Sequence, residues 1–592
     1  MEHNNRVVAA AVVILLAVFV AQALYFAANS SYTYDETVSV INGYYYLTTH
    51  DLRLGLSQPP LGAYLSAIPL FLLDVHFDFS RESCRAYDNW LCAHEVLFES
   101  GNNALQILFF SRLMSIAASA AVGFLIFVWA RELFGVRPAL LSLALFAFNP
   151  IIISHGTLAL TNSFLAFFVL LNFYFFHRLL RKYSFRNCAL FFLSFALAVA
   201  SKVNALILLP VIYTVLLLLL WRIKAVTLLP LLRKGWWANI KVFALHAFFG
   251  AVVTFFVLLM VYQFQFGTLA SSVPPKYVPV FEDKIASQLP LSIAKVAEFV
   301  VFRLPLPFPS FFSGAAWHAV AGETKLSFLN GEIFTGTKLL FFQLVFILKT
   351  PLALIALALL GLFISLAGKF KLHNPAAKGG ILFLIIPGVV WFAFFALTLN
   401  SGVQHILPIY PLVIILAGRS ALWLSGLNIR TAFISLLLLW SVASAALIAP
   451  YYLAYFNELA GGADRGHAVL GVPNFDWGQD LHSLRRYMAG NNISSLKLSY
   501  FGTASPASYG INFQYLASPI FQPWDPNFTP IAPKGYVESC GPASGIVAVS
   551  ATNYYGIFLN NRSCYDWLRN YQPVARVGHT IWVYNLSGGQ LN

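Results

Sequence analysis

The chain has 592 residues, of which 59% are hydrophobic and only 10% are charged, and its mean hydropathy is +0.72. Because a soluble globular domain carries about 25% charged residues, this composition excludes a soluble protein and indicates a polytopic membrane protein. The formal net charge of +14 is then no sign of nucleic-acid binding, since Lys and Arg collect in the cytoplasmic loops of membrane proteins.

Apolar segments near the length that crosses a bilayer, about 20 residues, recur along the chain. They predict eleven transmembrane helices, at 7–28, 106–130, 138–154, 158–176, 188–200, 203–221, 242–264, 338–365, 380–399, 406–418 and 431–449. Several of these spans are short, and residues 188–221 could form one long bent helix rather than two.

The basic residues predict how the chain crosses the membrane. If the N-terminus is cytoplasmic, five loops face the cytoplasm, and only Glu132 opposes their positive charge. These loops carry Arg131, Arg137, Arg178, Arg181, Lys182, Arg186, Arg222, Lys224, Arg233, Lys234, Lys241, Lys369, Lys371, Lys378, Arg419 and Arg430. The rule that Lys and Arg stay inside therefore predicts a cytoplasmic N-terminus and an extracytoplasmic C-terminus.

Three regions are expected on the outer side, at about 29–105, 265–337 and 450–592. The first contains a proline-bounded apolar run, Leu61 to Leu73, which we expect to lie on the membrane surface as a short helix. The third is long enough for a domain of its own, beside a transmembrane domain at 1–449. Strands are predicted at Ser495–Tyr500, Gly545–Ser550 and Thr580–Tyr584 and a helix at Asp480–Met488, which makes the third region a small α/β domain.

The cysteines agree with this orientation. Cys84 and Cys92 lie in the first outer region, and Cys540 and Cys564 lie in the C-terminal region, whereas Cys188 is alone beside a basic inner loop. Two close pairs on the oxidising side predict two disulfides, and the alternative is four unrelated thiols.

An acidic pair, Asp35 and Glu36, follows directly after the first span. In isolation the pair would be the solvated start of a loop, but charges held near a membrane core are costly and often functional. The chain has no glycine-rich phosphate loop, so an activated substrate would come from the membrane itself. A lipid-linked phosphate donor needs cations near the outer leaflet and a carboxylate base for the acceptor. The candidate groups on that side are Arg112, Lys202, Lys349 and His405.

With these residues in order along the chain, the sequence resembles the polytopic glycosyltransferases of the GT-C fold that use polyprenyl-phosphate-linked sugars. It resembles most the protein O-mannosyltransferase-like branch, with the lipid A aminoarabinose transferases as relatives. The motifs that carry the resemblance are Tyr34-Asp35-Glu36, Gln58-Pro59-Pro60, Arg112-Leu113, Asn149-Pro150 with His155, Ser201-Lys202, Tyr262 to Gly267, Pro305 to Pro309, Leu329 to Glu332, Lys349 to Pro351, His405 to Pro408, Tyr455 to Gly462 and Asp476 to Asp480.

The resemblance implies a role for each residue of the site. Asp35 would be the general base for the acceptor hydroxyl, with Glu36 supporting it, because a hydroxyl is a poor nucleophile until a carboxylate accepts its proton. The leaving lipid phosphate would be stabilised by Arg112, Lys202 and His405, with Lys349 as a weaker candidate. Direct displacement would invert the anomeric carbon. Four further polar groups are counted with the residues that bind the donor phosphate or the substrate, namely Gln58, His155, Asn162 and Gln404.

The chain departs from this family at two positions. Many relatives carry an Asp where Asn162 stands, and many carry an Arg where Gln404 stands. The change could be a compensated swap, a different way of binding the donor headgroup, or a sign of altered activity. The acidic pair could hold a divalent metal, but the chain lacks tight His/Asp/Glu ligand spacing, so no metal or cofactor is predicted. Asn474 to Asp480 is interpreted as a helix cap and turn, with acceptor handling as the alternative.

The sequence thus predicts an α-helical polytopic membrane protein with about eleven transmembrane helices, GT-C-like, and a small C-terminal α/β extracytoplasmic domain. The expected function is sugar transfer from a polyprenyl-phosphate carrier to a hydroxyl of a protein or lipid-linked glycan, at the outer face of a prokaryotic cell membrane. Two alternatives from other classes are a transporter or flippase for a lipid or glycan, and a non-catalytic protein with a decayed site. Transporters commonly show internal repeats, and none is evident here.

Overall fold

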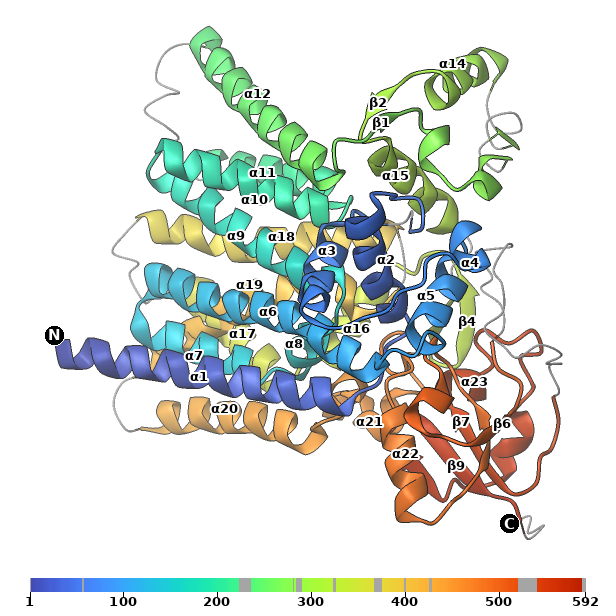
Figure 1. Cartoon of the computed structure of the whole chain (residues 1–592). Coiled ribbons are helices and arrows are strands. Elements are labelled where there is room, and N and C mark those ends of the chain that lie inside the picture. The colour runs from blue at the N-terminus through green and yellow to red at the C-terminus, as the bar shows by residue number, and fades with distance from the viewer. Residues whose placement is uncertain are drawn as a thin grey trace.

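The computed structural model describes most of the chain (Figure 1). The described residues are 2–55, 58–222, 236–279, 282–283, 290–322, 326–366, 375–398, 401–424, 428–519 and 540–587. Long helices lie side by side in one bundle, and shorter helices and strands gather at one end of it. This division follows the composition of the chain, because a backbone inside a bilayer must satisfy its own hydrogen bonds and therefore forms helices.

All eleven predicted spans fall on helices in the described part of the chain. Seven helices are long and apolar enough to cross a membrane, namely α1 (Glu2–Asn29), α6 (Ala104–Phe134), α9 (Thr161–Arg181), α11 (Ala205–Arg222), α12 (Trp236–Val261), α18 (Pro375–Thr398) and α20 (Ile429–Ile448). A bent pair, α16 (Phe341–Lys349) and α17 (Leu352–Leu366), meets the same criterion with an angle of 109°. The other predicted spans are the shorter apolar helices α7 (Val136–Ala147), α10 (Phe185–Ser201) and α19 (Tyr410–Gly418). The fold class is an α-helical polytopic membrane protein, as predicted.

Residues 188–221 form two helices rather than one bent helix. Helix α10 ends at Ser201, Lys202 is extended with φ −157° and ψ 128°, and α11 begins at Ala205. The break leaves Lys202 at the turn between two helices, where its side chain can reach residues of other segments.

The N-terminus lies at one end of the bundle and the C-terminal sheet lies at the other (Figure 1). Helices that end in basic residues, such as α9 with Arg178 and Arg181 and α11 with Arg222, run toward the end that carries the N-terminus. The basic residues Lys224, Arg233, Lys234, Lys369 and Lys371, which also supported the predicted orientation, lie outside the described residues. Which end faces the cytoplasm stays a prediction.

The two outer regions that interrupt the bundle fold into short elements. The first contains α2 (Glu36–Thr49), α3 (Leu61–Ala67), the 3₁₀ helix η1 (Ile68–Leu72), α4 (Glu82–Arg85) and α5 (Asn89–Phe98). The second contains β1 (Phe266–Gly267) paired with β2 (Leu306–Pro307), α14 (Leu291–Phe302), α15 (Pro309–Gly322), and the hairpin of β3 (Leu326–Leu329) and β4 (Glu332–Thr335). The apolar run Leu61 to Leu73 is helical as expected, with Leu72 83% exposed, and its place on the membrane surface stays a prediction.

The C-terminal region contains a five-stranded sheet of order β6-β5-β7-β9-β8. Its strands are β5 (Leu496–Ser499), β6 (Phe513–Tyr515), β7 (Ile546–Ser550), β8 (Ala575–Val577) and β9 (Ile581–Asn585). Strand β5 pairs in parallel with β6 and β7, and β9 pairs antiparallel with β7 and β8. With helix α22 (Leu481–Gly490), this is the small α/β arrangement that was predicted, and the three predicted strands are β5, β7 and β9.

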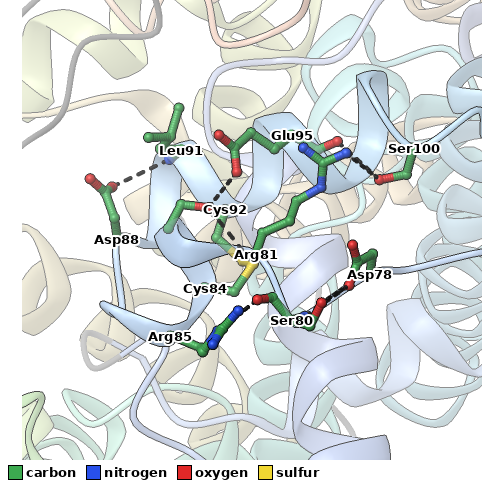
Figure 2. The surroundings of a disulfide bond; sticks show 11 residues. Asp78, Ser80, Arg81, Cys84, Arg85, Asp88, Leu91, Cys92, Glu95 and Ser100 are labelled. Atoms are coloured by element: carbon green, nitrogen blue, oxygen red, sulfur yellow. Dashed lines mark hydrogen bonds between the residues drawn. A yellow bond between two sulfur atoms is a disulfide. The ribbon is translucent and has the colours of Figure 1, made fainter.

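Both predicted disulfides are present. Cys84 is bonded to Cys92 and Cys540 to Cys564, while Cys188 is a buried free thiol. Figure 2 shows the first bridge, which joins α4 to α5. Near it, Ser83 donates to Glu95 at 2.5 Å, and Asp88 accepts a hydrogen bond from the backbone of Leu91 at the start of α5. The bridge therefore fixes the position of α5 relative to α4.

Candidate active site

The predicted acidic pair begins α2, directly after α1, and Glu36 forms a buried ion pair with Arg112 of α6. Arg112 donates to both carboxylate oxygens, at 2.8 Å from Nε and 2.6 Å from Nη2, and neither side chain is exposed. Its remaining donors reach the carbonyls of Ala27, Ser30 and Ser31. Arg112 was expected to contact the donor phosphate. The structure places its guanidinium against Glu36 and the end of α1, so Arg112 shapes the loop, and its contact with the donor phosphate stays a prediction.

Glu36 also binds two other parts of the site. Its Oε2 accepts from the backbone and the hydroxyl of Thr33, at 2.9 and 3.0 Å, and its Oε1 accepts from the backbone N–H of Ala159 at 2.9 Å. Because these bonds satisfy the buried carboxylate, Glu36 fixes both its own turn and the segment that precedes α9. Asp35 is the N-cap residue of α2 and is partly exposed on the same turn.

The loop that carries Asp35 is bonded to the C-terminal region. Ser31 donates its backbone N–H to the carbonyl of Gln479, and Tyr34 donates to the carbonyl of Trp477, both at 2.8 Å. The ring of Tyr34 stacks on Phe501 with centroids 5.1 Å apart and lies 4.9 Å from Trp90. The position of the proposed base is therefore set jointly by α1, α5 and the C-terminal region.

Three predicted site residues from distant segments converge on one ammonium group. Lys202, at the end of α10, lies with Nζ 3.5 Å from Oδ1 of Asn162 in the first turn of α9 and 3.4 Å from Nδ1 of His405. His405 belongs to the 3₁₀ helix η5 (Val403–His405), and its carbonyl accepts from the indole of Trp391 at 2.9 Å. Lys202 is only 8% exposed, so its charge lies in a poorly solvated place that suits a phosphate group.

Gln58 and Gln404 belong to segments that border this cluster. Gln58 is partly exposed before Pro59 and Pro60, which lead into α3. Helix α3 packs closely on the start of α9, since a Cβ added at Gly62 would meet Thr161 Cγ2 at 2.7 Å. Gln404 is 6% exposed and precedes His405 in η5.

Lys349 lies apart from the Lys202 cluster, at the bend between α16 and α17. Its ammonium donates to the carbonyl of Leu453 at 2.9 Å and to the carbonyl of Asn474, and it lies 4.3 Å from the ring centre of Phe456. Lys349 is fully buried. Its two hydrogen bonds join the bend to the C-terminal region. This arrangement gives Lys349 a structural task, and its contact with the donor phosphate stays a prediction.

His155 ends the short helix α8 (Pro150–His155) and is also buried. Its imidazole lies 6.0 Å from the indole of Trp477, between ring centres, and its Nδ1 has no hydrogen-bond partner among the described residues. His155 is therefore close to the same C-terminal segment that binds the loop of Asp35, and it is not one of the groups that contact Lys202.

The segment Asn474 to Asp480 forms the seam between the C-terminal region and the membrane part. Asp476 accepts from the backbone N–H groups of Gly478 and Thr552, at 3.2 and 3.0 Å, and Asp480 accepts from the hydroxyl of Thr580 at 2.6 Å. Burial raises the pKa of Asp476 to about 6, and burial also raises the pKa of Asp480. The bond from Gly478 to Asp476 supports the predicted turn, whereas Asp480, the N-cap residue of α22, makes no side-chain cap and binds Thr580 instead.

Asn474 is the residue whose importance the sequence did not reveal. Its Oδ1 accepts from the backbone N–H of Val403 at 2.9 Å, which joins the seam to η5 and hence to His405. Nothing in the sequence pairs two residues 71 positions apart, so only the polar density of the motif could have drawn attention to it.

These features define an integral membrane protein with a buried polar site at the end of its bundle. Among the described residues, no group of three His, Cys, Asp or Glu side chains could hold a metal ion. Residues 93–263 match the model of the family described as dolichyl-phosphate-mannose-protein mannosyltransferase. The predicted resemblance to that family is confirmed over this segment, which contains Arg112, Asn162 and Lys202.

Solved structures of low identity are also similar to the chain. ArnT from Cupriavidus metallidurans, bound to undecaprenyl phosphate, is 13% identical, with 98% of this chain and 99% of that chain covered and a TM-score of 0.44. The oligosaccharyltransferase of Archaeoglobus fulgidus in its apo form is 14% identical, with 73% of this chain and 55% of that chain covered and a TM-score of 0.42. At these values the likenesses say nothing about substrates. Comparison with curated proteins gave no match.

Proposed function

We propose that this protein is an integral membrane glycosyltransferase that moves a sugar from a polyprenyl-phosphate carrier to a hydroxyl of a protein or lipid-linked glycan. The observation that carries the proposal is that Asn162 and His405 both lie within hydrogen-bonding distance of the buried ammonium group of Lys202. Two of these residues lie in the segment that matches the mannosyltransferase family model.

The chemistry follows from a base and a cation on neighbouring segments. The Asp35 carboxylate accepts the proton of the acceptor hydroxyl as its oxygen attacks the anomeric carbon of the donor. The bond from that carbon to the phosphate oxygen breaks, and polyprenyl phosphate leaves with the electron pair. Lys202 and His405 stabilise the leaving phosphate, because a cation placed in a poorly solvated site opposes the negative charge directly. A single displacement of this kind inverts the anomeric carbon.

The bonds around Glu36 support Asp35 in this role. Glu36 holds the turn of Thr33 on one side and the backbone of Ala159 on the other, three residues before Asn162. The loop of the base and the segment of the phosphate cluster are thereby tied to one carboxylate. The site lies at the end of the bundle that carries the C-terminal region, which we place outside a prokaryotic cell membrane.

Sugar transfer in reconstituted liposomes tests the proposal. Polyprenyl-phosphate sugars labelled in the sugar are supplied with a membrane extract as acceptor, and wild type is compared with Asp35→Asn and with Asp74→Asn, an exposed carboxylate of the same outer region. General-base catalysis contributes about 10²–10⁴-fold, so we expect Asp35→Asn to lose transfer by that factor while Asp74→Asn retains it. Equal transfer by all three proteins would remove Asp35 from catalysis.

If no sugar is transferred from any donor, the proposed glycosyltransferase activity is contradicted and a lipid or glycan transporter is favoured. The same liposomes then give a second readout, because a labelled polyprenyl-phosphate sugar that changes leaflet becomes accessible to a membrane-impermeant periodate reagent. Movement without transfer would identify the transporter.

A further inference from the structure

Arg419 is a buried arginine that has no counter-charge in the described part of the chain. It begins the 3₁₀ helix η7 (Arg419–Trp423), which follows α19, and its exposed fraction is 0%. Its Nε and Nη1 make no hydrogen bond with any described residue. An arginine near a membrane surface usually keeps its charged head in water, and a buried charge without a partner is expensive. The two nitrogens therefore call for an acceptor.

Arg112 shows how the same fold satisfies a buried arginine. It is also 0% exposed, and all three of its guanidinium nitrogens donate, to Glu36 and to carbonyls at the end of α1. Arg419 has no comparable set of acceptors among the residues that the structure describes. The difference between these two side chains indicates that the acceptor of Arg419 is a ligand rather than a part of the fold.

Arg419 lies far from the proposed active site. Its guanidinium lies 4.8 Å from the ring centre of Phe134, which is the last residue of α6. Arg112 is near the start of the same helix, about 33 Å away at a rise of about 1.5 Å per residue. A ligand at Arg419 would therefore be separate from the donor held by Lys202.

The charged side chains around η7 are positive. Arg131 is exposed on α6 one turn before Phe134, and residues three apart share a helix face. Arg430 is also exposed, and its guanidinium lies 5.2 Å from the ring centre of Trp423 at the end of η7. These two arginines flank the position of Arg419 and would attract an anion to it.

The carboxylate nearest to this cluster in the sequence is engaged with another helix. Glu132 is the one acidic residue of the loops that carry the basic residues. It accepts a hydrogen bond from the hydroxyl of Tyr174 at 2.7 Å and lies 3.7 Å from Arg178, and both of these residues belong to α9. Glu132 is thus already paired on a helix other than the one that carries Arg419.

The guanidinium of Arg419 is covered on one side by a ring at an open turn. Phe134 is partly exposed, and Gly135 after it is exposed with φ 93°. A Cβ added at Gly135 would meet no described atom within 4 Å. On the other side the stem of Arg419 lies against α17, where its Cβ is 3.6 Å from the position of a Cβ at Gly361. A ligand that displaces the ring of Phe134 would reach the guanidinium from the turn between α6 and α7.

From this arrangement we propose that Arg419 binds an anionic phosphate group, and that the membrane supplies it as the head group of an anionic phospholipid. A guanidinium matches a phosphate in charge and in the direction of its donors. Basic sites between transmembrane helices bind anionic head groups in this way. The proposal is independent of sugar transfer. A bound head group would provide the missing acceptor and stabilise the folded protein.

Lipid titration of the purified full chain in a neutral detergent tests the site. The probes are dioctanoyl phosphatidylglycerol, dioctanoyl phosphatidylcholine and inorganic phosphate, and titration calorimetry gives the dissociation constants. The test variant is Arg419→Met. Arg186→Met, at an exposed arginine of α10, removes the same charge from the surface, and Lys202→Met removes the phosphate site of the proposed function.

We expect wild type to bind phosphatidylglycerol more tightly than phosphatidylcholine, because Arg131 and Arg430 repel the choline group. Affinity for phosphatidylglycerol should fall roughly ten- to a hundredfold in Arg419→Met, which loses charge-assisted hydrogen bonds. Arg186→Met and Lys202→Met should bind it as wild type does. Without lipid, Arg419→Met should melt no lower than wild type, because an apolar side chain replaces an unpaired buried charge.

Equal affinity of wild type for the two lipids, or unchanged affinity in Arg419→Met, would overturn the site. Loss of phosphatidylglycerol binding in Lys202→Met would place the lipid at the proposed active site and overturn it as well. Inorganic phosphate that binds as tightly as phosphatidylglycerol would overturn the lipid as the source and retain the phosphate site. If Arg419→Met does not fold, Phe134→Leu provides the second test. It keeps the charge and removes the ring, so lost binding there would contradict the proposal.

Discussion

Arg112 donates to both oxygens of Glu36 from a position that no solvent reaches, so the two side chains form one buried bidentate ion pair between α6 and the start of α2. The guanidinium plane matches the carboxylate, and its other donors are taken by three carbonyls at the end of α1. This completeness matters because a buried pair stabilises a fold only when its remaining hydrogen-bonding groups are also satisfied.

Breaking the pair from one side should be strongly destabilising. Glu36→Gln or Arg112→Met leaves an unpaired buried charge or a set of unpaired carbonyls, and such losses cost about 3–5 kcal/mol. We expect a clear fall in the apparent melting temperature in detergent. The control is Arg569→Ala, which removes a pair whose side chains are 62% and 45% exposed and which is worth about 0–1 kcal/mol. Melting temperatures that fall equally in both cases would contradict the structural role of the buried pair.

Lys202 should matter for donor binding more than for stability. In Lys202→Met the phosphate loses one charge-assisted hydrogen bond, worth about 1.5–3 kcal/mol, so polyprenyl phosphate should bind roughly ten- to a hundredfold more weakly. Binding to purified protein in nanodiscs measures this directly. Lys295→Met, an exposed lysine of α14, serves as the matched control. Unchanged affinity in Lys202→Met would remove Lys202 from the donor site.

The seam at Asp476 predicts a dependence of stability on pH. The pKa of Asp476 in the folded protein is about 6, above its ordinary value of 3.8, because burial disfavours the carboxylate. The folded state therefore holds the proton more tightly than the unfolded state. The contribution of protonated Asp476 to the free energy of unfolding is complete below pH 3.8 and is lost as the pH rises through 6. The free energy of unfolding changes by about 3 kcal/mol over this range.

Melting temperatures measured from pH 3.8 to just above 6, the window set by the unfolded and folded pKa values of Asp476, test this contribution of the seam. We expect Asp476→Asn to flatten the fall that wild type shows as pH rises. Asp480 and Arg486 also act on this region, so a residual slope should remain. Asp78→Asn, an exposed carboxylate, should keep the wild-type profile. A wild-type protein whose stability rises between pH 5 and 7, with the same rise in Asp476→Asn, would contradict the assignment.

The bridge between Cys84 and Cys92 should stabilise the outer region that holds α5. The two cysteines are separated by 8 residues in the sequence. A bridge that closes a loop of this length restricts the unfolded chain and raises the free energy of unfolding by about 2–3 kcal/mol. In the double variant Cys84→Ser, Cys92→Ser we expect faster proteolysis between α4 and α5. We also expect a weaker contact between Nδ1 of His94 and the carbonyl oxygen of Thr503, which are 3.0 Å apart. Cys188→Ser removes a thiol outside any bridge and should leave the proteolysis pattern unchanged.

Local signals in the sequence predicted most of the architecture. Each span was visible as a run of apolar residues, and each disulfide followed from the side of the membrane on which its cysteines were expected. Partners across long separations were not visible. Arg112 has the charge that a phosphate needs, and only the fold shows that Glu36, 76 residues earlier, takes it. The two carbonyl partners of Lys349, 104 and 125 residues later, were likewise not visible in the sequence.

The convergence of Asn162, Lys202 and His405 lies between these cases. The residue types and their common side were evident from the sequence, so a shared site was expected. The contact itself needs the break at Lys202 and the 3₁₀ turn of η5, and neither has a strong propensity signal. For Asn474 the only signal was the polar density of its motif, because its bond to Val403 depends on how the C-terminal region docks.

The loop of Asp35 also constrains how the protein is made. Ser31 and its neighbours leave the ribosome early, and the residues that bind them, such as Gln479 and His482, follow about 450 positions later, since His482 and Ser31 are 451 residues apart. At synthesis rates of about 5–20 residues per second, the first outer loop waits roughly 20–90 seconds for its partner. During that interval only contacts already synthesised, with Arg112 among the earliest, can hold the loop. A nascent chain stalled before residue 479 would therefore possess its membrane helices and lack an assembled site.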